Sequence, residues 1–181
     1  MKTHADIRKI AERYNMLPNI LWTVVNLAPV YVFCYRQVPL LHLVIILSVA
    51  LVTAFLPARW YKLLQLGRHA TAYRRVGILF IRRFSQDGDL INRILRRKYP
   101  NYKVIRDASQ NRRYIQRSYM YERCHVAVCV AMLALAVYAL CGRQYGWALV
   151  IMLNNLLYNI YPVWLQQYNR LRLQAIMNRR S

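Results

Sequence analysis

Two acid–base residues lie close together in the chain, Glu122 and His125. Residues three apart in a helix share one face, so we expect the carboxylate and the imidazole to be neighbours. A carboxylate fixes the tautomer of an imidazole and stabilises its cation, which suits a general base that deprotonates a hydroxyl. The structural alternative is that Glu122 pairs with Arg123 or an arginine of the preceding segment, and that His125 bonds to a backbone carbonyl.

A second polar cluster follows one stripe nearer the C-terminus. Its members are spaced by four, three and four residues: Asn155, Asn159, Pro162 and Gln166. At helical periodicity this stripe continues into Asn169 and Arg170. Amide groups are costly inside a membrane and are therefore candidates for function. The alternative is that they hydrogen-bond packed helices to each other, which applies most strongly to Asn154 and Asn155.

The sequence does not indicate metal or covalent chemistry. The Glu-x-x-His spacing occurs in di-iron bundles, but those sites need a second such motif and two further glutamates, and only one other glutamate is present. His125 and Cys129 share a helix face without a third ligand. Cys34 and Cys141 fall at the outer ends of apolar runs and would pair only on an oxidising side. There is no phosphate-binding glycine loop, so we expect no metal and no cofactor.

Four apolar runs must position these residues. Of the 181 residues 57% are apolar, and 27 Lys and Arg outnumber 6 Asp and Glu. A helix needs about 20 apolar residues to cross a bilayer. The four runs that approach this length are residues 17–35, 38–56, 124–141 and 146–165. A basic nucleic-acid-binding domain has no use for four such runs, so we expect an all-α integral membrane protein.

Basic residues alternate with nearly neutral segments along the chain. The segment between the second and third runs, residues 58–123, holds 17 Lys and Arg, whereas each short loop within a pair of runs holds one Arg. Positive charge marks the cytoplasmic side. We therefore expect two helical hairpins, joined by a basic, partly helical cytoplasmic linker, with both termini cytoplasmic.

The remaining segments complete a single membrane domain over residues 1–181. We expect residues 1–16 to form an interfacial helix, because Ile7, Ile10, Tyr14 and Leu17 make one apolar stripe. The linker covers residues 57–123 and the basic tail residues 166–181. Within the linker, Asp89 can cap a helix whose apolar strip is Leu90, Ile91, Ile94 and Leu95, and another helix should run from about Asp107 into the third apolar run.

The linker arginines have two interpretations. They set membrane topology and bind anionic lipids, or a subset of them binds an anionic group of a substrate, such as a CoA phosphate or a phospholipid head group.

Three stretches of the chain resemble one known family, the glycosyl-4,4′-diaponeurosporenoate acyltransferases. The first runs from Tyr73 to Asn92 and contains Gly77 and Asp87-Gly88-x-x-x-Asn92. The second is Glu122-x-x-His125, and the third reaches from Asn159 through Gln166-Gln167-Tyr168-Asn169-Arg170-Leu171-Arg172. The chain has Gln167 where the family shows arginine. Members of this family are small bacterial membrane proteins that attach a fatty acyl chain to a sugar hydroxyl of a carotenoid glycoside, which implies a bacterial inner-membrane location.

The resemblance implies a set of roles. His125 is the expected base and Glu122 its orienting partner, while Asn159, Gln166 or Asn169 would stabilise the oxyanion. Residues expected to bind substrate are Tyr168, Asn169, Arg170, Arg172, Arg82, Arg83, Asp87 and Asn92. The donor would be acyl-CoA or an acyl-carrier protein, and the acceptor a membrane lipid or glycolipid. One alternative is a non-catalytic lipid-binding or scaffold protein. The other is a small membrane methyltransferase or phosphotransferase, which no nucleotide or metal motif supports.

Overall fold

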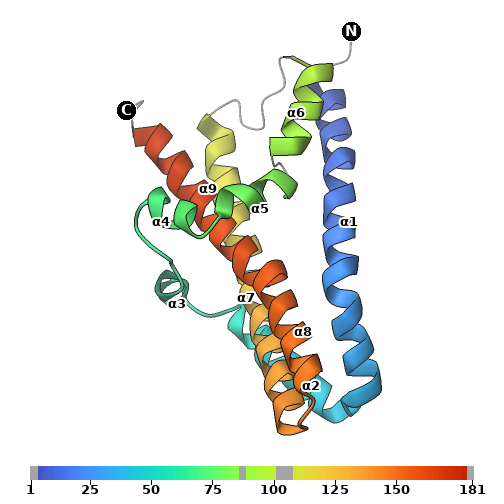
Figure 1. Ribbon diagram of the computed structural model, residues 1–181. Helices are drawn as coiled ribbons and strands as arrows, with labels where there is room; N and C mark the ends of the chain where they lie inside the picture. The colour runs from blue at the N-terminus through green and yellow to red at the C-terminus, as the bar shows by residue number, and fades with distance from the viewer. Residues whose placement is uncertain (1–3, 86–88, 101–107, 179–181) are drawn as a thin grey trace.

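A computed structural model describes residues 4–85, 89–100 and 108–178, and this part of the chain is entirely helical (Figure 1). The elements are α1 (His4–Gln37), α2 (Leu40–Thr53), α3 (Ala58–Leu63), α4 (Ala70–Arg75), α5 (Ile78–Phe84), α6 (Asp89–Lys98), α7 (Ala108–Cys141), α8 (Tyr145–Asn155), a π-helical turn η1 (Leu156–Ile160) and α9 (Tyr161–Asn178). The first turn of α1 and the last turn of α9 lie at the same end of the molecule.

Three helical stretches are long and apolar enough to cross a membrane. They are Lys9–Gln37 in α1, Asn111–Cys141 in α7, and Tyr145–Asn178, which joins α8, η1 and α9. The second apolar run, expected to span over residues 38–56, forms only the 14-residue helix α2. That helix is about 21 Å long, against about 30 Å for the hydrocarbon core. By length and composition, three helices of the described residues can therefore span a membrane, and α2 by itself is shorter than a span.

The expected interfacial helix is continuous with the first span. The helix α1 runs for 34 residues without a break, although it contains Pro18 and Pro29. Three members of its predicted apolar stripe, Ile7, Ile10 and Tyr14, pack against a buried cluster of Ala11 with Ile91 and Leu95 of α6, whereas Leu17 is 70% exposed. The two helices thus cover part of each other's apolar faces, so most of the stripe predicted to lie on the membrane faces protein.

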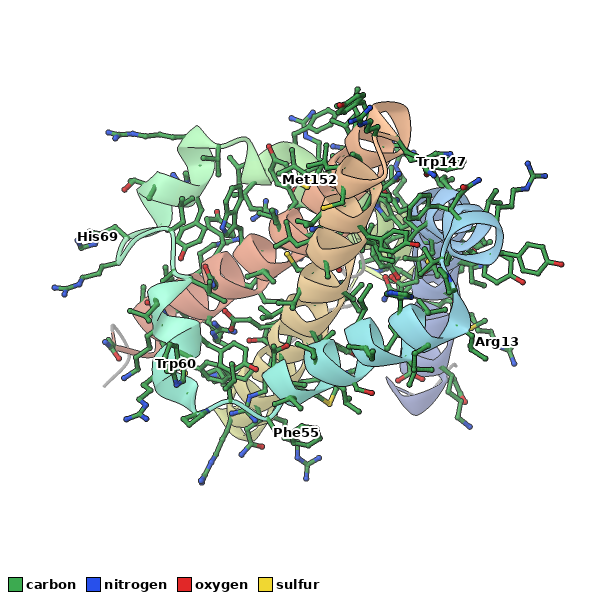
Figure 2. The ribbon with its side chains drawn as sticks, turned by 90° about the horizontal axis from the view of Figure 1, so that it is seen from below. Arg13, Phe55, Trp60, His69, Trp147 and Met152 are labelled. Atoms are coloured by element: carbon green, nitrogen blue, oxygen red, sulfur yellow. The ribbon has the colours of Figure 1, made fainter. Side chains whose placement is uncertain are left out.

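A core of small and branched side chains joins α1, α7 and α8 at the opposite end. Phe33 of α1 is fully buried there, and three alanines, Ala136, Ala139 and Ala148, bring α7 and α8 close together. Small residues permit close packing where lipid supplies no hydrophobic drive between helices. Apolar side chains also cover much of the outer surface. Figure 2 shows Phe55 and Trp60 at the periphery, 78% and 49% exposed.

The short helices of the linker pack on the last helix. Tyr73 of α4 and Ile78 of α5 are fully buried in a cluster with Leu165 and Tyr168 of α9. Figure 1 shows α4 and α5 alongside α9. The helix expected to continue from the linker into the third span is present as α7, 34 residues long. Because α7 is about 50 Å long, it extends well beyond a hydrocarbon core, and its N-terminal part belongs to the same layer as the linker helices.

Gly77 provides a test of how the linker is folded. Gly77 lies between α4 and α5 with φ +79°, and other residues adopt this conformation at a cost of about 1–2 kcal/mol. A Cβ at this position would meet no atom within 4 Å, so any effect of a larger residue comes from the backbone. We expect Gly77→Ala to lower the free energy of unfolding by about that amount, measured by circular dichroism in detergent. The matched control is Gly146→Ala, in open space within α8. Equal effects of the two changes would contradict a backbone origin.

Candidate active site

The most deeply buried charge in the structure is the carboxylate of Glu122, on α7. Glu122 is 1% exposed and forms an ion pair with Arg170 of α9, itself 4% exposed. The guanidinium of Arg170 also donates to Ser118 Oγ at 3.1 Å, and it lies 4.0 Å from the centre of the Tyr119 ring. A buried charge is tolerated only when it is paired and hydrogen-bonded. The pair therefore fixes α9 against α7.

A second set of hydrogen bonds connects this pair to the linker. Gln167 Nε2 donates to Glu122 Oε1 at 2.6 Å, and its carbonyl accepts a bond of 3.0 Å from the hydroxyl of Tyr73. Tyr73 also donates to the Gly67 carbonyl at 3.2 Å. Burial raises the pKa of the Tyr73 phenol, so the hydroxyl stays protonated and remains a donor. Helices α4, α7 and α9 thus share one buried polar network.

The structure corrects the expectation that Glu122 orients His125. Both oxygens of Glu122 are occupied by Arg170 and Gln167, and the ring of His125 bonds instead to Asn159. The arginine prevails because a guanidinium neutralises a buried carboxylate, whereas a neutral imidazole does not. The alternative drawn from the sequence, that an arginine pairs with Glu122, is correct. The arginine is Arg170 of α9, however, and not Arg123 or a residue of the preceding segment.

His125 ends a chain of hydrogen bonds that begins at a backbone carbonyl. Asn155 Nδ2 donates to the Cys129 carbonyl at 3.1 Å, Asn159 Nδ2 donates to Asn155 Oδ1 at 2.9 Å, and Asn159 Oδ1 lies 3.4 Å from His125 Nδ1. A backbone carbonyl only accepts, so the direction of each bond in the chain is set. In the neutral ring the proton is therefore on Nδ1 and the lone pair on Nε2, the arrangement a general base needs.

The backbone next to Asn159 is irregular. Residues Leu156–Ile160 form a π-helical turn, and the carbonyl of Tyr158 is a second acceptor for the His125 ring. Pro162, four residues after Tyr158, has no N–H to offer that carbonyl in the α-helical pattern. The rings of His125 and Tyr158 are nearly perpendicular, with centroids 5.9 Å apart. His125 itself is partly exposed.

The π-helical turn also explains which glutamine is buried. A regular helix would place Gln166 on the stripe of Asn155 and Asn159, but one π-turn advances the stripe by about one residue. The inward residues of α9 are accordingly Val163, Gln167 and Arg170. Gln166 and Asn169 are partly exposed, and neither makes a side-chain hydrogen bond within the described residues. The sequence analysis therefore chose Gln166, the residue next to the buried Gln167.

The expected anion-binding arginines separate into two groups. Arg170 is occupied by Glu122, whereas Arg82 and Arg172 both lie against the buried ring of Tyr168, 5.9 and 5.7 Å from its centre. Arg82 also donates two bonds to Asp89, at 2.9 and 3.1 Å. Arg83 is exposed. The ring of Tyr168 therefore contacts two arginines, one from the linker and one from the tail.

One expected residue lies away from these contacts, one falls outside the described residues, and the cysteines are unpaired. Asn92 is partly exposed on α6, next to a basin of about 470 Å³ that is also lined by Arg93 and Arg96. Asp87 lies outside the described residues. All four cysteines are free thiols, so the pairing considered for Cys34 and Cys141 is not formed.

Residues 57–179, more than half of the chain, match the protein family described as glycosyl-4,4′-diaponeurosporenoate acyltransferase. The chain belongs to this family. The matched segment contains both polar networks and the arginines at Tyr168, but not α1 or α2. No curated protein and no solved structure matches the chain. The resemblance identified from three short motifs is thus confirmed, and with it a general acyltransferase role in an apolar, helical protein.

The ion pair of Glu122 and Arg170 can be tested for its effect on stability. Removing one partner leaves the other charge buried and unpaired, so Glu122→Leu and Arg170→Met should each lower the free energy of unfolding by about 3–5 kcal/mol. The double variant should cost less than either single change. The measurement is the denaturation midpoint of the purified protein in detergent. Additive losses in the double variant would show that the pair does not act as a unit.

Proposed function

We propose that this protein is an O-acyltransferase that moves a fatty acyl group from a cytosolic donor to a hydroxyl of a membrane lipid or glycolipid. The observation that carries the proposal is His125: a partly exposed histidine, inside the family match, whose Nδ1 is held by a hydrogen-bond chain of set direction. A general base needs one ring nitrogen to be unprotonated, and an acceptor at Nδ1 leaves Nε2 in that state.

The reaction balances with the chain's own groups and the two substrates. His125 Nε2 takes the proton of the acceptor hydroxyl as its oxygen attacks the carbonyl carbon of the donor thioester. The tetrahedral intermediate then collapses, the carbon–sulfur bond breaks, and the imidazolium returns the proton to the departing thiolate. The products are an ester and a free thiol. No covalent acyl-enzyme is needed, because the acceptor oxygen attacks the donor directly.

The oxyanion of that intermediate needs hydrogen-bond donors. Asn159 is a poor candidate, because its amide N–H groups already face Asn155 Oδ1, at 2.9 Å, and Met132 Sδ, at 3.0 Å. Gln166 and Asn169 retain their amide groups for this role, since neither bonds to another described side chain. We therefore assign Asn159 to positioning His125, and Gln166 or Asn169 to the oxyanion.

The donor is acyl-CoA or an acyl-carrier protein, each of which carries phosphate. Arg82 and Arg172, which each lie against Tyr168, and the exposed Arg83 are the ligands we propose for such a phosphate. A guanidinium group binds phosphate well because its donors match the phosphate oxygens, and Arg82 would exchange its bonds to Asp89 for the phosphate. The remaining basic residues would bind anionic lipid head groups. The distribution of basic residues supports cytoplasmic termini and a bacterial inner-membrane location, with α2 and the turn after it as the fourth crossing.

Replacement of His125 tests the base. His125→Gln should reduce acyl transfer by about 10²–10⁴-fold without changing the amount of folded protein in the membrane. His42→Gln is the matched control, because His42 is an exposed histidine on an apolar helix, and its ring lies 5.7 Å from that of Tyr138 and away from the proposed site. The measurement compares host lipids by mass spectrometry for species heavier by one acyl group. A product that persists in His125→Gln would point to a non-catalytic protein and an endogenous host enzyme.

Asn159 provides a second test, of the tautomer. Asn159→Asp keeps an acceptor oxygen opposite Nδ1, whereas Asn159→Leu removes it and frees the ring to adopt the wrong tautomer. We expect kcat to fall about tenfold or more in Asn159→Leu, and less in Asn159→Asp. Initial rates of acyl transfer by the two variants, at equal folded concentration, measure this difference. The opposite order would mean that packing at Asn159, rather than its oxygen, matters for activity.

A further inference from the structure

Polar residues lie along one face of the first membrane helix, α1. The family match does not include this helix. Asn15, Asn19, Thr23 and Asn26 are spaced by four, four and three residues within the span Lys9–Gln37. This spacing puts them on one stripe of α1. Asn15 and Asn26 are buried, at 4% and 1% exposure. Polar groups inside a membrane helix are costly, so a continuous stripe of them calls for a function.

Thr23 connects this stripe to the base. Its hydroxyl lies 3.1 Å from the hydroxyl of Tyr158, a residue of the π-helical turn. The ring of Tyr158 in turn stands edge-on to the ring of His125, at an interplanar angle of 76°. The contacts between α1 and η1 therefore place Thr23 against Tyr158, whose ring in turn packs against the ring of His125.

These two hydroxyls are accessible from the lipid side. Thr23 is exposed, and Tyr158 and His125 are partly exposed. The neighbours of Thr23 on α1 include Ile20 and Val24, which are 52% and 58% exposed. Two hydroxyls that share one hydrogen bond still have one O–H and several lone pairs to offer. Such a pair can both donate to and accept from another hydroxyl.

We infer that Thr23 and Tyr158 bind a second hydroxyl of the acceptor while His125 deprotonates the first. This inference rests on the proposed function and goes beyond it, because it assigns α1 to the acceptor site and requires at least two neighbouring hydroxyls in the acceptor head group. The tail of the acceptor then lies along the apolar surface of α1 beside Ile20 and Val24.

The test compares two acceptors that differ in one hydroxyl. The probes are an alkylglycerol, which presents a vicinal diol, and the alkanol of equal chain length, each supplied in nanodiscs with palmitoyl-CoA. We expect the wild type to prefer the diol. Thr23→Val and Tyr158→Phe should each lower kcat/KM for the diol about three- to tenfold, the contribution of one hydrogen bond, and leave the alkanol unchanged. Thr23→Ser should restore the preference. Thr53→Val is the control, because the Thr53 hydroxyl bonds only within its own helix, to Ala50.

The outcomes separate this inference from the proposed function. Because the two hydroxyls act together, the double variant Thr23→Val/Tyr158→Phe should resemble either single variant. Equal loss with both probes would assign Thr23 a structural role and overturn the inference. A wild type without preference for the diol, or one that acylates neither probe yet forms a His125-dependent product in host lipids, would also overturn it while the proposed function stands. If neither probe is acylated and no His125-dependent lipid forms in the host, the proposed function itself is contradicted.

Discussion

The buried carboxylate of Glu122 is the constraint on which the rest of this structure depends. An unpaired carboxylate would not remain charged at 1% exposure, so the fold must bring a cation and further donors to it. Arg170 and Gln167 of α9 meet that need, and Tyr73 completes the hydrogen bonding from α4. The positions of the linker and of the last helix follow from this one requirement. The apolar contacts of Ile78 and Leu165 then fill the space around the network.

One helical turn separates this network from the one that holds His125. Glu122 and His125 lie three residues apart on α7, yet their partners are different residues of the last helical stretch. The first network is charged, closed and buried, which suits a purely structural role. The second consists of neutral amides and ends at a ring that remains partly exposed. The proposed base thus lies beside a rigid support, and the two networks do not share the Glu122 carboxylate.

Sequence periodicity predicted much of the fold, because it depends on residues that are close together in the chain. The apolar runs, the helix that begins at Asp89, and the helix that continues into the third span all depend on residues close together in the chain. The candidate residues were also well placed, since Glu122, His125, Asn159 and Arg170 all belong to the two networks. Their partners were not predictable, because a carboxylate accepts equally from any nearby donor and only the packed fold decides which one is near. The contact between Thr23 and Tyr158 joins residues 135 positions apart, beyond any local pattern.

The π-helical turn at Leu156–Ile160 also constrains how this family can vary in length. A π-turn accommodates one extra residue, so the loss of one residue from Leu156–Ile160 would restore a regular helix without changing which face of α9 points inward. Gln167 and Arg170 would then still face Glu122. A single-residue deletion in the regular part of α9 is different, because each residue there turns the chain by about 100° and every later side chain would be rotated by that angle. Relatives that lack the extra residue should carry their arginine and glutamine one position earlier.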